Sequence, residues 1–170
     1  MAEEIDFERL WEIVSDHCHG DIYSVHGPAH WHRVEQNGLL LASRTKADIA
    51  IVRLFAIFHD SCRVNEGTDD GHGARGAIYA AELRGSAFEL DDLSFGILQD
   101  ACIWHTDQDH SADPTIGTCW DADRLDLGRV GMVPNADYMS TTFGKEIANY
   151  GSIQPFLAAS PAAIPSRKLG

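Results

Sequence analysis

The sequence predicts an all-α protein, a single-domain helical bundle of about seven helices. Apolar residues recur at intervals of three and four along a series of helix-length segments. Glycine, proline and short polar residues separate these segments, as they do at helix ends. No segment alternates polar and apolar residues as a strand would, so no sheet is expected. The chain has 170 residues, of which 44% are hydrophobic, and this is enough for one core.

The first three helices are predicted from their periodicity and their ends. Residues 3–18 place apolar side chains at helical spacing and are followed by Gly20. The second helix begins near Pro28, a residue suited to a first helical turn, and extends to about residue 43. Residues 46–60 are apolar almost all the way round, which is typical of a helix in the middle of a bundle. This third helix is therefore expected to lie at the centre.

Four further helices are predicted at residues 73–85, 91–106, 113–128 and 134–150. The fourth has an alanine-rich middle and ends in glycine, and the fifth has two acidic residues in its first turn. The sixth begins with Asp113 and Pro114, a capping residue followed by proline, and the seventh begins at Pro134. Residues 1–150 are expected to form the helical domain. Residues 151–170, rich in proline and alanine, are expected to form a loosely docked or disordered tail.

The charge balance excludes several classes of partner. The chain has 13 Lys and Arg residues against 26 Asp and Glu residues, a formal net charge of −13. Binding to long nucleic acid or to an anionic membrane surface needs a basic face, which this composition does not favour. The longest apolar run, residues 49–58, is too short for a membrane span, and the acidic N-terminus is unlike a secretory signal. The four cysteines form no C-x-x-C pair, so we expect a cytoplasmic protein with reduced thiols. The sequence leaves the oligomeric state open.

Ionisable residues fall on four helix faces that should be buried. His59 and Asp60 end the apolar third helix, and Asp123 shares a face with apolar residues of the sixth. His105 lies on the apolar stripe of the fifth helix, and His30 lies on the inward face of the second. Burying such groups is costly unless they are paired or bind a metal ion.

Taken singly, each of these residues also fits a structural role, since a lone histidine on an apolar face is usually a hydrogen-bonded core residue. Together they supply imidazoles and carboxylates from separate helices, a mixed nitrogen and oxygen set that suits a divalent transition metal. Spacing alone leaves the metal site and the structural roles as two open interpretations. His32 is expected to point to the opposite side of its helix from His30.

Three segments match, in order, the motifs of a known family. They are His30-Trp31-His32-Arg33-Val34, then Phe58-His59-Asp60, then Asp121-Ala122-Asp123-Arg124-Leu125-Asp126. In these segments the chain resembles the HD-domain superfamily of metal-dependent phosphohydrolases, whose pattern is H…HD…D. The resemblance covers residues 30–127 and implies a helical fold in which four residues bind a divalent ion (Mn, Mg, Co, Ni, Fe or Zn): His30, His59, Asp60 and Asp123.

The resemblance also implies an activity, the hydrolysis of a small phosphorylated compound by a metal-activated water. Nucleotides are the first substrate class by analogy with relatives. Asp60 is the predicted catalytic residue, which would orient or deprotonate that water. His72 and His105 are predicted to bind a second metal or the substrate, and Arg63 and Arg75 are the candidates for holding phosphate. No role is assigned to His17, His19, His26 or His110.

Two other interpretations remain open. Some relatives with six ligands in the order H, HD, H, H, D hold two irons and perform oxygen-dependent cleavage, and His72 and His105 could complete that set. Bound iron and a need for oxygen would distinguish such an oxygenase from a hydrolase. The other interpretation is an inactive HD scaffold, which predicts missing ligands, whereas all four are present here.

Overall fold

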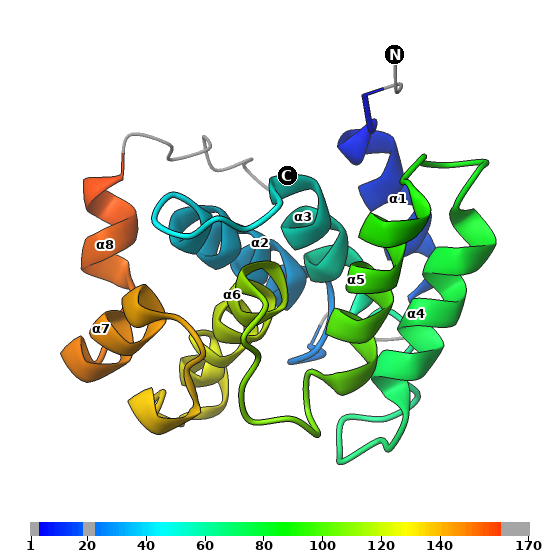
Figure 1. Cartoon of the computed structure of the whole chain (residues 1–170). Helices are drawn as coiled ribbons and strands as arrows, with labels where there is room; N and C mark the ends of the chain where they lie inside the picture. Colours follow the sequence, from blue (N-terminus) through cyan, green and yellow to red (C-terminus); the bar gives the residue numbers. More distant parts are fainter. Residues whose placement is uncertain (1–3, 19–22, 161–170) are drawn as a thin grey trace.

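The computed structural model of the chain describes residues 4–18 and 23–160, which are all-helical and contain no strand (Figure 1). The all-α prediction is therefore confirmed. None of the helices in these ranges is long and apolar enough to cross a membrane. The elements are α1 (Phe7–His17), α2 (Pro28–Ala42), α3 (Ile49–Phe58), α4 (His72–Leu83), α5 (Asp92–Trp104), α6 (Pro114–Arg124), the 3-10 helices η1 (Leu127–Val130) and η2 (Ala136–Tyr138), α7 (Thr142–Tyr150) and α8 (Gln154–Ala159).

Helix α3 lies at the centre of the bundle, as its apolar sequence predicts. It contacts α1, α2, α4, α5 and α6. From Ile51 to Phe58 every side chain except that of Arg53 is buried. Arg53 leaves the core and pairs with Glu35 of α2, with Nε and Oε1 2.7 Å apart. The helix therefore carries the two residues that follow it, His59 and Asp60, into the interior.

Helix α4 packs closely on α3 and α5 because two of its residues are glycine. A Cβ atom added at Gly76 would lie 2.2 Å from the carbonyl oxygen of Phe58, and one added at Gly73 would lie 2.1 Å from that of Cys102. Both distances are far below van der Waals contact, so a larger residue would push α4 away. The close approach brings His72, the first residue of α4, against the ends of α3 and α5.

The chain after α6 differs from the sequence prediction. The sixth helix ends at Arg124 rather than near residue 128, and two 3-10 helices precede α7. The buried carboxylate of Asp121 accepts hydrogen bonds from the backbone N–H groups of Ser140 and Thr141. The Thr141 hydroxyl in turn accepts from the N–H of Gly144 and caps α7. Because of these contacts α7 begins at Thr142, whereas the sequence predicted a start at residue 134.

Part of the predicted tail is helical. Helix α8 contacts α2, and Phe156 packs against the core behind the buried side chain of Ile153. The remainder of the predicted tail, residues 161–170, lies outside the described residues.

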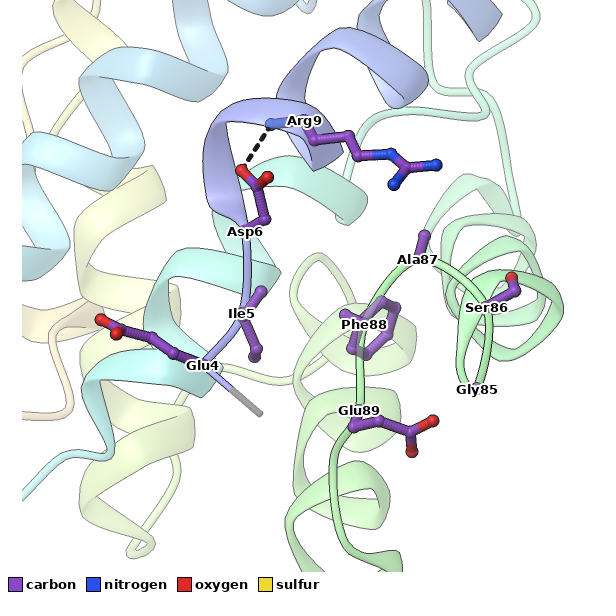
Figure 2. A pocket seen from close by; sticks show the side chains of 9 residues that line it. All are labelled: Glu4, Ile5, Asp6, Arg9, Gly85, Ser86, Ala87, Phe88 and Glu89. Atoms are coloured by element: carbon purple, nitrogen blue, oxygen red, sulfur yellow. Dashed lines mark hydrogen bonds between the residues drawn. The ribbon is translucent and has the colours of Figure 1, made fainter. Parts of the chain in front are cut away.

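A small cavity of about 270 Å³ lies between the start of α1 and the turn from α4 to α5 (Figure 2). Asp6, in its lining, accepts the backbone N–H of Arg9 at 3.0 Å and caps α1. Gly85 forms the turn with a φ of 85°, a conformation that residues with a side chain rarely adopt. This end of α4 is the one opposite to His72.

Candidate metal centre

The histidine and aspartate residues singled out in the sequence meet at one end of the bundle. Each of them lies at or next to the end of a helix. All are buried except Asp123, whose side chain is 18% exposed. The six are His30 (first turn of α2), His59 and Asp60 (directly after α3), His72 (start of α4), His105 (directly after α5) and Asp123 (last turn of α6).

The first group consists of His30, His59 and Asp60, whose candidate ligand atoms lie within 4.8 Å of one another. The Nε2 atoms of the two histidines are 3.2 Å apart. Oδ2 of Asp60 lies 3.5 Å from Nε2 of His30 and 3.7 Å from that of His59. Oδ1 of Asp123 lies 3.1 and 3.8 Å from the same two nitrogens. The structure therefore brings the four sequence-predicted ligands around one point.

The second group shares Asp60 and adds His72 and His105, again within 4.8 Å. The Nε2 atoms of these two histidines are 3.0 Å apart. Oδ1 of Asp60 lies 3.1 Å from Nε2 of His72 and 3.7 Å from that of His105. One carboxylate thus faces both histidine pairs, with Oδ2 towards the first and Oδ1 towards the second. A carboxylate that bridges two metal ions needs this placement.

The outer ring nitrogen of each histidine is held by an acceptor. Because a carbonyl or carboxylate oxygen only accepts, Nδ1 must carry the hydrogen, and in the neutral ring Nε2 keeps its lone pair. Nδ1 of His30 lies 2.7 Å from Oδ2 of Asp126. In the other three histidines the acceptor is a backbone carbonyl: Phe55 for His59 at 3.0 Å, Asp69 for His72 at 2.8 Å and Cys102 for His105 at 2.7 Å.

This donor set fits divalent metal ions. Two nitrogen ligands at about 2.1 Å from a common ion, roughly at right angles, are about 3 Å apart. The two Nε2–Nε2 distances, 3.2 and 3.0 Å, agree with that spacing. Facing lone pairs at such distances repel one another unless a proton or a cation lies between them. Hydrogen bonds to the outer nitrogen are also what orients metal-binding histidines in proteins.

The electrostatics of the cluster favour positive charge. Burial lowers the pKa of His59 to about 4, so this imidazole is neutral. Burial also lowers the pKa of His30 and His105, but their carboxylate neighbours outweigh it and hold both pKa values above the ordinary histidine range. Burial raises the pKa of Asp60, yet the histidines around it hold that pKa well below the usual range. The ionised carboxylates therefore attract either protons or a cation.

Asp126 supports the centre from outside. Its Oδ2 faces Nδ1 of His30, and its Oδ1 accepts a hydrogen bond from Nε of Arg33 at 2.8 Å. Burial raises the pKa of Asp126, but these two partners lower it below the usual range. The residue therefore presents a full negative charge to His30.

Sequence reasoning missed His26 and Asp126. Nδ1 of His26 lies 3.1 Å from Oδ2 of Asp60, at the edge of the first group. His26 precedes α2, so helical periodicity could not place it, and its position one turn before His30 was the one signal available. Asp126 falls inside the sixth helix as predicted from the sequence, but α6 ends before it and the chain turns it towards His30.

The arginines predicted to hold phosphate are engaged by the protein. Nε of Arg63 donates to Oδ1 of Asp60 at 3.0 Å. One terminal nitrogen donates to the carbonyl of Gly67 at 3.0 Å, and the other lies 3.5 Å from Nε2 of His72. Arg75 donates to Oδ1 of Asp69 at 2.6 Å and to two backbone carbonyls. Both side chains fix the loop between α3 and α4. Their contact with phosphate stays a prediction.

The other histidines within the described residues lie away from the centre. His32 is 55% exposed and stacks on Trp11 with ring centroids 3.9 Å apart, so it points away from His30, as predicted. His17 and His110 lie on the surface. His19 falls outside the described residues.

Comparison with known proteins identifies a similar fold. A solved structure from an uncultured Thermotogales bacterium, described as a predicted HD superfamily hydrolase, superposes with a TM-score of 0.69. The two sequences are 26% identical over 91% of this chain and 92% of the other. No protein-family model matches the chain, and no curated protein matches it. The fold match and the buried histidine and aspartate cluster both agree with the H…HD…D resemblance of the sequence.

Proposed function

From the premise that this chain is an HD-domain protein, we propose that it is a metal-dependent phosphohydrolase that cleaves a small phosphorylated compound. The observation that carries the proposal is the carboxylate of Asp60, placed between two histidine pairs whose Nε2 atoms face each other. Phosphoryl transfer needs positive charge that neutralises the phosphate oxygens beside an activated water. The chain's own net charge of −13 would otherwise repel an anionic substrate.

Two sets of side chains would hold divalent ions. When bound there, such ions supply a Lewis acid for a phosphate oxygen and lower the pKa of a coordinated water. The first set is His30, His59, Asp60 and Asp123, and the second is Asp60, His72 and His105.

The protein's own groups keep this arrangement in place. Backbone carbonyls and Asp126 fix the imidazole rings, and Nε of Arg63 holds Oδ1 of Asp60. Asp60 stays ionised because its pKa is lowered, so it can accept a hydrogen bond from a water beside it. In this proposal Asp60 orients that water, with its basicity reduced by its role as a ligand.

The first experiment is elemental analysis of protein purified without a chelator or a histidine tag. It is followed by a phosphate-release screen with Mn, Mg, Co and Ni over nucleotides and simple phosphate esters, nucleotides being ranked first by analogy alone. We expect up to two metal ions per chain and release of phosphate without oxygen. Absence of any bound metal under all of these conditions would contradict the proposal.

A di-iron oxygenase is the second candidate function. The observation that favours it is that the six potential ligands, in the order H, HD, H, H, D, lie around one shared carboxylate. An anaerobic assay separates the two candidates. Turnover without oxygen supports the hydrolase, whereas two irons per chain with oxygen consumption and no phosphate release supports the oxygenase.

Removal of His59 together with the shared Asp60 tests the assignment of the centre. His59→Ala combined with Asp60→Ala is expected to abolish metal binding and leave far-UV helicity largely intact, because the rest of α3 stays packed. His32→Ala is the matched control, since that side chain stacks on Trp11 away from the centre. Stoichiometric metal in the double variant would show that other residues bind it.

A further inference from the structure

A large cavity lies beside the metal centre and contains none of its six candidate ligands. Its volume is about 810 Å³, within the range of small-molecule sites in proteins. Residues of α2, η1, the segment after η1, α7 and the start of α8 form its walls. In Figure 1, α7 and α8 lie on one side of the bundle, where α8 contacts α2 and α7 contacts α6.

The polar part of the cavity carries more positive than negative charge. Arg33, Asp126 and Arg129 line it. Arg129 is 10% exposed and is held by the carbonyls of Val25 and Asp126. Arg33 uses Nε for Asp126, its side chain is 42% exposed, and its two terminal nitrogens have no partner among the described residues. A guanidinium edge is therefore available to an anion.

The remainder of the cavity has an apolar wall beside the uncharged polar residues Gln36, Asn37, Ser152 and Gln154. Ile147 and Ile153 are buried in its wall, and Leu157 adds to it from α8. Met132 and Val133 stand at the rim with 57% and 74% of their surface exposed. Exposed apolar residues beside a pocket mark surface that a ligand can cover.

We propose that this cavity is a binding site for a small organic anion with an apolar body, separate from the metal centre. The terminal nitrogens of Arg33 would bind a carboxylate or phosphate head, and the isoleucine and leucine wall would cover the hydrocarbon part. The small cavity of Figure 2 differs, because its lining has a negative balance that would repel an anion. It contains three acidic residues, Glu4, Asp6 and Glu89, and one arginine, Arg9.

Ligand binding is measured on chelator-treated full-length chain, so that anions cannot bind through a metal ion. The probe is 1-anilinonaphthalene-8-sulfonate, an anion with an apolar body whose fluorescence rises on binding. Octanoate, octan-1-ol and octylammonium then compete for it at equal chain length. We expect octanoate to displace the probe at a concentration at least roughly tenfold below that of the alcohol, and the amine to compete least.

Matched variants locate the site. Arg33→Gln is expected to weaken octanoate binding on the order of tenfold, whereas Arg44→Gln, which also neutralises an exposed arginine, leaves it unchanged. Val133→Glu should weaken binding as well, and Leu93→Glu, at a similarly exposed position outside the cavity, should not. Thermal melts show whether each variant is folded. If Arg33→Gln does not fold, Val133→Glu still tests whether the ligand binds in this cavity.

The proposal would be overturned if octan-1-ol and octanoate displaced the probe equally well. It would also be overturned if each variant, Arg33→Gln and Val133→Glu, bound octanoate as tightly as its control. None of these measurements involves metal or turnover. Their outcome is therefore independent of the outcome of the phosphohydrolase assays.

Discussion

The hydrogen-bond acceptor at the outer ring nitrogen affects how strongly each histidine can bind a metal ion. His59, His72 and His105 face backbone carbonyls, which no substitution removes. His30 faces the carboxylate of Asp126 instead, with Nδ1 and Oδ2 2.7 Å apart. A carboxylate partner raises the basicity of a metal-binding imidazole. His30 is therefore the histidine whose ligand strength depends on one replaceable side chain.

Asp126→Asn is expected to weaken metal binding by about 10- to 100-fold, because the amide lacks the negative charge and has one acceptor oxygen for the two donors, His30 and Arg33. Competition with a chromophoric chelator measures the change. Asp92→Asn is the control, since Asp92 is 98% exposed and pairs with Arg84 far from His30. Equal affinities in the two variants would show that Asp126 does not support the centre.

Metal binding is expected to weaken as pH falls. The pKa values of His30 and His105 lie above 6.5, so these rings take up protons already above the ordinary histidine range. A metal ion binds the neutral imidazole, so affinity is high at alkaline pH and is lost as pH falls through the raised pKa values. Titration with Mn²⁺ from about pH 8.5 to about pH 6 measures this loss. A flat profile would contradict it.

Helix α4 shows how a residue that weakens an isolated helix can be required by the packing of that helix in the protein. Glycine is about 1 kcal/mol less favourable than alanine inside a helix. Helix α4 nevertheless has Gly73 and Gly76, both directed at the carbonyl oxygens of neighbouring helices. The intrinsic loss is offset by an approach that brings His72 to 3.0 Å from His105.

Gly76→Ala is expected to lower the melting temperature and weaken metal binding, because its Cβ would lie 2.2 Å from the carbonyl oxygen of Phe58 and α4 would have to move. Gly96→Ala is the matched control. Gly96 lies inside α5, and its Cβ would meet nothing within 4 Å, so alanine there should leave stability unchanged or raise it. If both variants melt alike, close packing at Gly76 is not required.

The candidate ligands come from the ends of five helices, α2 to α6. Bound metal would join those ends, and a ligand that binds only the folded state stabilises it. Treatment with a chelator is therefore expected to lower the melting temperature while far-UV helicity at room temperature stays the same. An unchanged melting temperature for demonstrably loaded protein would show that these ends hold together without the ion.

The helices that depend on a long apolar face could be predicted from the sequence. The helix ends and loop positions that depend on tertiary contacts could not. The apolar run of α3 was enough to place it at the centre of the bundle. The start of α7 could not be predicted, because it depends on the Asp121 carboxylate, about twenty residues earlier, accepting from Thr141. Likewise, the position of His26 beside Asp60 follows from the path of a loop, which has no periodicity to detect.

The bundle has two distinct ends, and the candidate ligands all lie at one of them. The connections at residues 43–48 and 84–91 join the ends of α2 to α3 and α4 to α5 that lie away from the candidate ligands. The helices between are 10 to 15 residues long, or about 15–22 Å at 1.5 Å per residue. Ser86, labelled in Figure 2, is exposed in the second of these connections. A fluorophore or a surface-immobilisation handle attached there would thus leave the histidines at the other end uncovered.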